Sequence, residues 1–147
     1  MRAAPKGENS MKTYIIAYFS TALAFVCIDA VWLTNAAELL YQPELGDMLL
    51  PQFKLMPAVL FYLLYMVGIV VFAVAPALDD GKWTTATWRG ALFGLIAYAT
   101  YDLTNQATLK GWSTLVTIAD LIWGTFLTGT AATVGYLLTR RLASRSA

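Results

Sequence analysis

Residues 56–78 read MPAVLFYLLYMVGIVVFAVAPAL, a run without a charged side chain that decides the fold. A helix rises about 1.5 Å per residue, so a run of this length crosses the ~30 Å hydrocarbon core of a bilayer. A helix also satisfies its own backbone hydrogen bonds, for which lipid offers no partners. The run therefore predicts a membrane-spanning helix.

Other segments of the chain have a similar length and apolar character. Prolines, glycines and charges separate them, as at Pro43, Pro76 and residues 79–81. The first segment contains Asp29 and is long for the core of a signal peptide, so we expect it to be retained. The predicted fold is all-α, an integral membrane antiparallel four-helix bundle. Its spans are expected at about residues 13–33, 56–78, 88–105 and 113–138.

The composition agrees with a membrane environment. Apolar residues make up 59% of the chain and charged residues 13%, whereas a soluble domain has about 25% charged residues. A net charge of +1 gives no strong field for nucleic acid, so membrane lipids are the expected partners. Cys27 is the only cysteine and histidine is absent, which excludes a disulfide within the chain, a cysteine-based zinc or iron–sulfur site and a Ser-His triad. We therefore expect no cofactor.

The positions of lysine and arginine predict the orientation. Only Lys54 and Lys110 fall on one side of the predicted membrane. The positive-inside rule then places both termini in the cytoplasm. Residues 1–10 are predicted to be a disordered cytoplasmic tail and residues 140–147 a basic one, and Met11 is a second candidate start. The basic residues assigned to the cytoplasmic side are Arg2, Lys6, Lys12, Lys82, Arg89, Arg140, Arg141 and Arg145.

Three carboxylates lie within the predicted spans: Asp29, Asp102 and Asp120. Each is expected roughly 5–10 Å below the outer surface at about 1.5 Å of rise per residue. An ionisable group in a membrane is costly, so these side chains should face the bundle interior or a wet cavity. We predict a polar pocket that opens outward. Its candidate lining residues are Asp29, Trp32, Tyr98, Tyr101, Asp102, Asn105, Asp120 and Trp123.

Short sequence echoes accompany these acids. Residues 29–32 and 120–123 share the pattern D-x-x-W, and residues 33–35 and 103–105 share L-T-N. Duplication of a two-helix unit and independent placement of acids near interfacial tryptophans both explain the echo. Gly90 and Gly94 form a G-x-x-x-G pair, which permits close contact between helices.

Three acids in one poorly solvated pocket cannot all stay ionised cheaply, so at least one should hold a proton or a cation. The functional interpretations are a proton relay, a cation site with oxygen ligands and an acid/base pair. The structural interpretation is a set of interhelical hydrogen bonds that fix the bundle. Lys54 or Lys110 is a further candidate partner for one acid.

Three motifs carry a resemblance to a known family: D-A-V-W-L at residues 29–33, Y-D-L-T-N at 101–105 and A-D-L-I-W-G at 119–124. With them the chain, from residue 11 to its end, resembles the bacterial membrane protein family called domain of unknown function 2177. The resemblance implies a small four-helix protein of the bacterial inner membrane, and it carries over no activity and so names no catalytic residue. The family's association with genes for membrane fatty-acid modification favours a lipid-related role.

The leading functional hypothesis is an inner-membrane protein whose acidic pocket, near the outer leaflet, binds a cation, a proton or a lipid headgroup. It would act as an accessory to membrane-lipid metabolism, alone, as a homo-oligomer or in a larger membrane complex. The first alternative is a proton-coupled transporter or channel subunit acting as an oligomer. The second is a lipid-modifying enzyme, which the sequence favours less because no nucleophile–base pair is visible.

Overall fold

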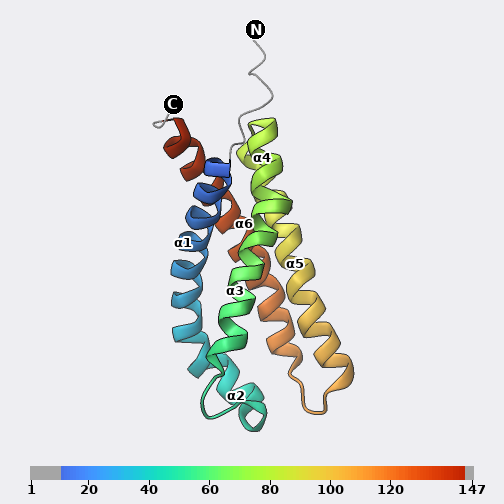
Figure 1. Ribbon diagram of the computed structural model, residues 1–147. Coiled ribbons are helices and arrows are strands. Elements are labelled where there is room, and N and C mark those ends of the chain that lie inside the picture. The colour runs from blue at the N-terminus through green and yellow to red at the C-terminus, as the bar shows by residue number, and fades with distance from the viewer. Residues whose placement is uncertain (1–10, 145–147) are drawn as a thin grey trace.

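The computed structural model describes residues 11–144, and every regular element in that range is helical, which confirms the predicted all-α class (Figure 1). The predicted tail at residues 1–10 and residues 145–147 lie outside the described range, whereas residues 140–144 form the end of the last helix. In chain order the elements are α1 (Met11–Ala36), the π-helical turn η1 (Ala37–Tyr41), α2 (Gln42–Leu45), the 3-10 turn η2 (Gly46–Met48), α3 (Leu55–Ile69), the π-helical turn η3 (Val70–Val74), α4 (Ala75–Asp80), α5 (Trp83–Thr108) and α6 (Thr114–Ser144).

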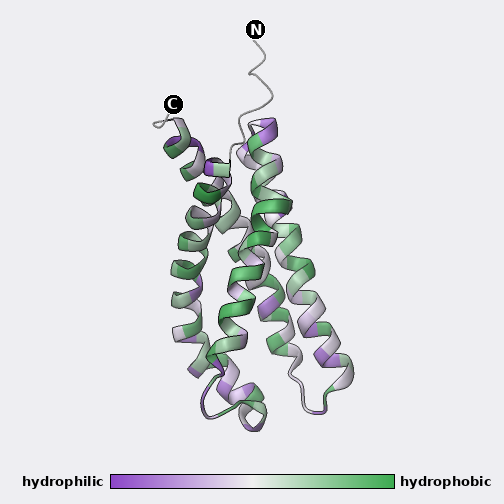
Figure 2. Cartoon of the chain, viewed as in Figure 1, coloured by the Kyte–Doolittle hydropathy of each residue, from purple (hydrophilic) through white to green (hydrophobic). Residues whose placement is uncertain are grey.

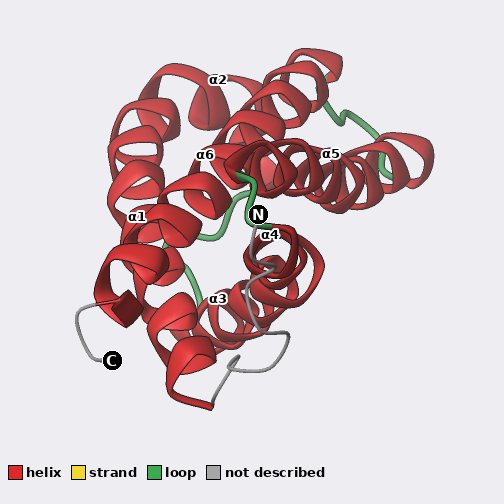
Figure 3. Cartoon of the chain, turned by 90° about the horizontal axis from the view of Figure 1, so that it is seen from above, coloured by secondary structure: helices red, strands yellow, loops and turns green. Residues whose placement is uncertain are grey.

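The long helices stand side by side as a bundle (Figures 1 and 3). At one end α1 begins, α4 meets α5 and α6 finishes. At the other end, called the α2 end below, lie α2, η2 and the turn between α5 and α6. Hydrophobic residues make up most of the length of the helices, and many of the strongly hydrophilic residues lie near the two ends of the bundle (Figure 2).

Within residues 11–144, three helical stretches are long and apolar enough to cross a membrane. Their outward surface carries large apolar side chains such as Leu23, which is 64% exposed, and Leu64, which is 73% exposed. A surface of this kind suits lipid rather than water. α5, at the place of the third predicted span, is not among them because residues such as Arg89 and Asp102 lower its mean hydropathy. The three stretches are Met11–Met48, Leu55–Asp80 and Thr114–Ser144.

Two prolines that were expected to mark helix boundaries lie inside helical stretches. Pro43 is in the first turn of α2 and Pro76 in the first turn of α4. Each follows a five-residue π-helical turn, η1 or η3. Proline has no N–H, and its ring clashes with the carbonyl four residues earlier in an α-helix. A π-helical turn, with hydrogen bonds across five residues, is wider and admits the ring, so the helix continues past both prolines.

Glycines allow α5 and α6 to pack closely over a long contact. A methyl group at Gly94 would overlap the Gly124 carbonyl, and one at Gly90 would press against Ala132. The G-x-x-x-G pair therefore faces α6. At the same depth the hydroxyls of Thr128 and Tyr65 lie 2.9 Å apart and connect α6 to α3. The close packing of α5 against α6 sets the rotation of both helices, and therefore the direction in which Asp102 and Asp120 point.

Candidate functional site

The three predicted acids lie about two helical turns from the α2 end, on three different helices. Asp29 of α1 and Asp120 of α6 are each 6% exposed, and Asp102 of α5 is 0% exposed. All three side chains thus face the interior. Within residues 11–144, however, no three acidic or cysteine side chains come together in a way that would hold a metal ion. Each acid has its own surroundings.

Asp29 accepts hydrogen bonds from two aromatic side chains on other helices. The Tyr62 hydroxyl of α3 donates to one carboxylate oxygen at 2.5 Å. The Trp123 indole Nε1 of α6 donates to the other at 3.3 Å. The ring of Tyr62 also meets Phe25 edge to face, with centroids 5.9 Å apart. Asp29 therefore joins α1 to α3 and to α6, which is the interhelical arrangement that its burial requires.

Asp120 accepts its hydrogen bond from a residue of η1. The Tyr41 hydroxyl donates to one oxygen of Asp120 at 2.6 Å, and the same hydroxyl accepts from Trp32 Nε1 at 3.1 Å. Trp32 stacks on Trp123, with ring centroids 4.4 Å apart and planes 11° apart. A continuous chain of polar and aromatic contacts therefore runs from Asp29 to Asp120.

The two D-x-x-W motifs cross in this network. Trp123, from the second motif, donates to Asp29 of the first. Trp32, from the first, reaches Asp120 of the second through Tyr41. The crossing arises because α1 begins and α6 finishes at the same end of the bundle, so the step from Asp to Trp points in opposite directions (Figure 1). Each tryptophan then lies level with the other motif's aspartate.

Asp102 has no such partner. Both carboxylate oxygens are buried without a hydrogen bond in the described part of the chain. Asp120, on the neighbouring helix α6, acts on it electrostatically. The neighbouring predicted residues do not reach it: Tyr101 is 59% exposed and packs edge-on against Trp112, and Asn105 lies beside the Tyr101 hydroxyl. A buried carboxyl left unpaired in this way calls for a physical explanation.

A cavity of about 300 Å³ lies between α3 and α5, and Asp120 of α6 also lines it. Its walls are Phe61, Ala97, Tyr98 and Tyr101. A groove of about 440 Å³ shares Phe61 and Ala97 with this cavity and continues along α3, η3 and α5. The remaining residues of the groove are almost entirely apolar: Leu64, Tyr65, Val67, Gly68, Val71, Phe72 and Phe93.

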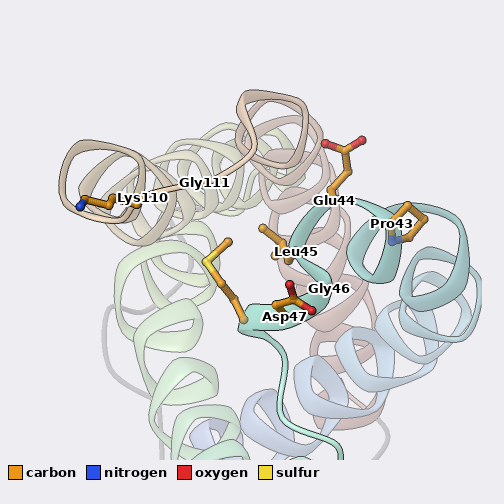
Figure 4. A pocket seen from close by; sticks show the side chains of 8 residues that line it. Pro43, Glu44, Leu45, Gly46, Asp47, Lys110 and Gly111 are labelled. Atoms are coloured by element: carbon orange, nitrogen blue, oxygen red, sulfur yellow. The ribbon is translucent and has the colours of Figure 1, made fainter.

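Another hollow of about 410 Å³ lies at the tip of the α2 end, between α2, η2 and the α5–α6 turn (Figure 4). Leu45 points into it, whereas Glu44 and Lys110 point away from its centre (Figure 4). The Glu44 carboxylate instead accepts a hydrogen bond from the Ser113 hydroxyl at 2.5 Å. This hollow does not include the buried acids, so it is separate from the candidate site.

Six of the eight predicted pocket residues therefore belong to two groups, which share Asp120. Asp29, Trp32, Trp123 and Asp120 belong to the aromatic network, and Tyr98, Tyr101 and Asp120 line the cavity. The other two do not line the cavity: Asp102 is fully buried without a hydrogen bond to the described residues, and Asn105 lies beside the Tyr101 hydroxyl. The sequence reasoning missed Tyr41, Tyr62 and Phe61 as site residues. Tyr62 is one of the few polar residues in its span, but only the π-helical turn brings Tyr41 over Asp120. Lys54 and Lys110 are exposed, and the hydrogen bonds to Asp29 and Asp120 come from aromatic side chains.

Comparisons with known proteins bear on the family rather than on the site. The model of the family described as DUF2177, predicted membrane protein, matches residues 14–137. The resemblance inferred from three short motifs is thereby confirmed. No curated protein and no solved structure matched the chain.

Proposed function

Because the chain belongs to the DUF2177 family of predicted membrane proteins and has several helices that can cross a bilayer, we propose that it binds a membrane lipid beside Asp120. The observation that carries this proposal is the continuity of an apolar groove with a cavity whose lining includes one carboxylate, Asp120, and the phenols of Tyr98 and Tyr101. Phe61 and Ala97 line both. A lipid has the same division, because its polar headgroup is joined to a long apolar chain.

The topology that we propose has four spans in a bacterial inner membrane, arranged antiparallel, with both termini in the cytoplasm. α5 is included as a span, the third in chain order, because it packs along α6. α6 is itself long and apolar enough to cross a membrane. The excess of basic residues at the end opposite α2 supports the orientation. In this topology the α2 end faces outward, and Asp120 lies near the outer leaflet.

The groove between α3 and α5 holds the acyl chain in this proposal. Its lining consists of aliphatic and aromatic side chains such as Leu64, Val71 and Phe93. Shape, rather than a hydrophobic driving force, selects the chain here, because the surrounding lipid is equally apolar. The groove thus positions one lipid among many, and the headgroup site supplies the preference.

The cavity offers hydrogen-bonding groups to the headgroup. One oxygen of Asp120 accepts from Tyr41, and the other is available to accept from a donor in the cavity. The phenols of Tyr98 and Tyr101 line the same space and both donate and accept hydrogen bonds. Two carboxylate oxygens cannot both be satisfied by Tyr41, so a headgroup that donates hydrogen bonds fits this cavity best.

A lipid held in this way suits a protein that accompanies membrane-lipid metabolism. The bound lipid would be presented at the outer leaflet to a partner in the membrane, or sensed there. Association of the chain with itself or with a larger membrane complex belongs to the same proposal.

Native mass spectrometry of protein released from lipid nanodiscs tests the proposal. Ala97→Phe fills the junction of groove and cavity, and Ala107→Phe places the same ring at an exposed position of the same helix. We expect a retained lipid on the wild type and on Ala107→Phe, and its loss from Ala97→Phe. Equal retention by both variants would show that the groove is not the binding site. The same spectra report the oligomeric state.

A further inference from the structure

Asp102 is the buried carboxyl that the aromatic network leaves out. It is 0% exposed, and neither oxygen has a hydrogen-bond partner among residues 11–144. An ionised carboxylate in such a place costs several kcal/mol unless a cation compensates it. A carboxylic acid that keeps its proton avoids most of this cost. In the empty site Asp102 is therefore the neutral acid.

The groups that interact electrostatically with Asp102, without a hydrogen bond to it, are an acid and two phenols. Asp120 acts on it from α6, the Tyr41 hydroxyl from η1 and the Tyr101 hydroxyl from its own helix. None of these carries positive charge. A negative charge on Asp102 would therefore repel Asp120 and have no cation to offset it. A positive group that enters the cavity from outside the described chain would favour its ionisation.

A positive group in the cavity would contact Asp120, which lines it, and would act on Asp102 through the electrostatic interaction between the two acids. A cation at the free oxygen of Asp120 would offset the repulsion between Asp120 and Asp102. Resting on the lipid-binding function proposed above, we propose that the headgroup is an ammonium and that its binding releases the proton of Asp102. In this step the O–H bond of Asp102 breaks, its proton passes to water, and the lipid ammonium remains protonated at Asp120.

The linkage between proton release and ligand binding sets the direction in which the affinity for the ammonium changes with pH. The occupied site holds one proton fewer than the empty site, so a rise in pH favours occupation. The affinity for the ammonium should increase by up to about tenfold per pH unit across the range in which Asp102 ionises. A neutral ligand with the same chain should show no such increase.

The test uses the full chain in phosphatidylcholine nanodiscs and two photoreactive probes, a long-chain primary alkylamine and the alkanol of equal length. Crosslinking to peptides that contain Phe61 or Ala97 measures occupancy between about pH 5 and about pH 8, where the amine stays protonated. We expect amine occupancy to rise with pH in the wild type. Asp102→Asn should bind the amine with no pH dependence, and Asp47→Asn, which removes an exposed carboxylate at the same end, should behave as the wild type.

A second measurement needs no variant. Addition of the amine to weakly buffered wild-type protein should release about one proton per site, read with a pH-indicator dye. The proposal is overturned if no proton appears, or if Asp102→Asn keeps the wild-type pH slope. If the alkanol occupies the groove and Ala97→Phe removes it while the amine shows no preference, lipid binding stands and the ammonium assignment fails. If neither probe labels the groove, the proposed function itself fails.

Discussion

Tyr62→Phe isolates one hydrogen bond of the buried aromatic network. The variant keeps the ring and its edge-on contact with Phe25, and it removes only the hydroxyl that donates to Asp29. Asp29 would then keep Trp123 Nε1 at 3.3 Å, beyond the ~2.7–3.2 Å of a good N–H···O bond. With Asp29 only 6% exposed, water cannot replace the lost donor.

The magnitude follows from these contacts. A hydrogen bond to a charged group is worth about 1.5–3 kcal/mol in soluble proteins, and measured interhelical bonds in membranes average about 0.6 and reach about 1.7 kcal/mol. Since Asp29 loses its shorter hydrogen bond, we expect the free energy of unfolding to fall by about 1–2 kcal/mol. That is a change of about 5- to 30-fold in the ratio of folded to unfolded protein.

Unfolding by SDS titration in mixed micelles, followed by circular dichroism, measures this loss. Tyr18→Phe is the matched control, because its hydroxyl donates at 3.1 Å to the neutral Leu63 carbonyl rather than to a carboxylate, and its loss should cost about 0.6 kcal/mol, the membrane average. Asp29→Asn combined with Tyr62→Phe should cost less than the sum of the single variants, since both act on the same bond. Equal losses for Tyr62→Phe and Tyr18→Phe would refute the reasoning.

Two further predictions concern packing and topology. Gly94→Ala should lower stability in the same titration by about 1–3 kcal/mol, because the added methyl group meets the Gly124 carbonyl; an unchanged midpoint would contradict the close contact between α5 and α6. In a Cys27→Ser background, a cysteine replacing Glu44 should react with an impermeant maleimide added to intact cells. One replacing Asp80 should react only after lysis, and the reverse pattern would invert the proposed orientation.

Part of this architecture could be predicted from local sequence. The helical class follows from apolar length and the cost of unpaired backbone groups in lipid. The inward direction of Asp29, Asp102 and Asp120 follows from the cost of a carboxylate against lipid. Trp32 and Trp123 were expected near these acids because both lie one helical turn after an aspartate, and the structure stacks them on each other.

The division of the acids could not be predicted in the same way. Spacing along a helix gives the depth of each carboxyl, but its partner depends on how neighbouring helices are rotated and where backbone irregularities fall. Asp29 meets Tyr62 and Asp120 meets Tyr41, while Asp102 meets neither. The expectation of one shared acidic pocket treated the three as equivalent. In the structure Asp29 accepts two hydrogen bonds, and Asp120 accepts one and lines the cavity. Asp102 has no hydrogen-bond partner among the described residues.

The π-helical turn η1 connects this division to the proposed function. An α-helix ending near residue 33 would have left Tyr41 in a loop and Asp120 without a donor. Because η1 continues the helical stretch before Pro43, Tyr41 reaches across to Asp120 and occupies one of its oxygens. That leaves one oxygen of Asp120 for a donor in the cavity, while Asp102 has no hydrogen-bond partner among the described residues. The second oxygen of Asp120 can accept a hydrogen bond from a lipid headgroup. In our proposal the unpaired Asp102 releases its proton when a positively charged headgroup binds. The backbone irregularity and the missing partner of Asp102 are therefore two parts of the same proposed site.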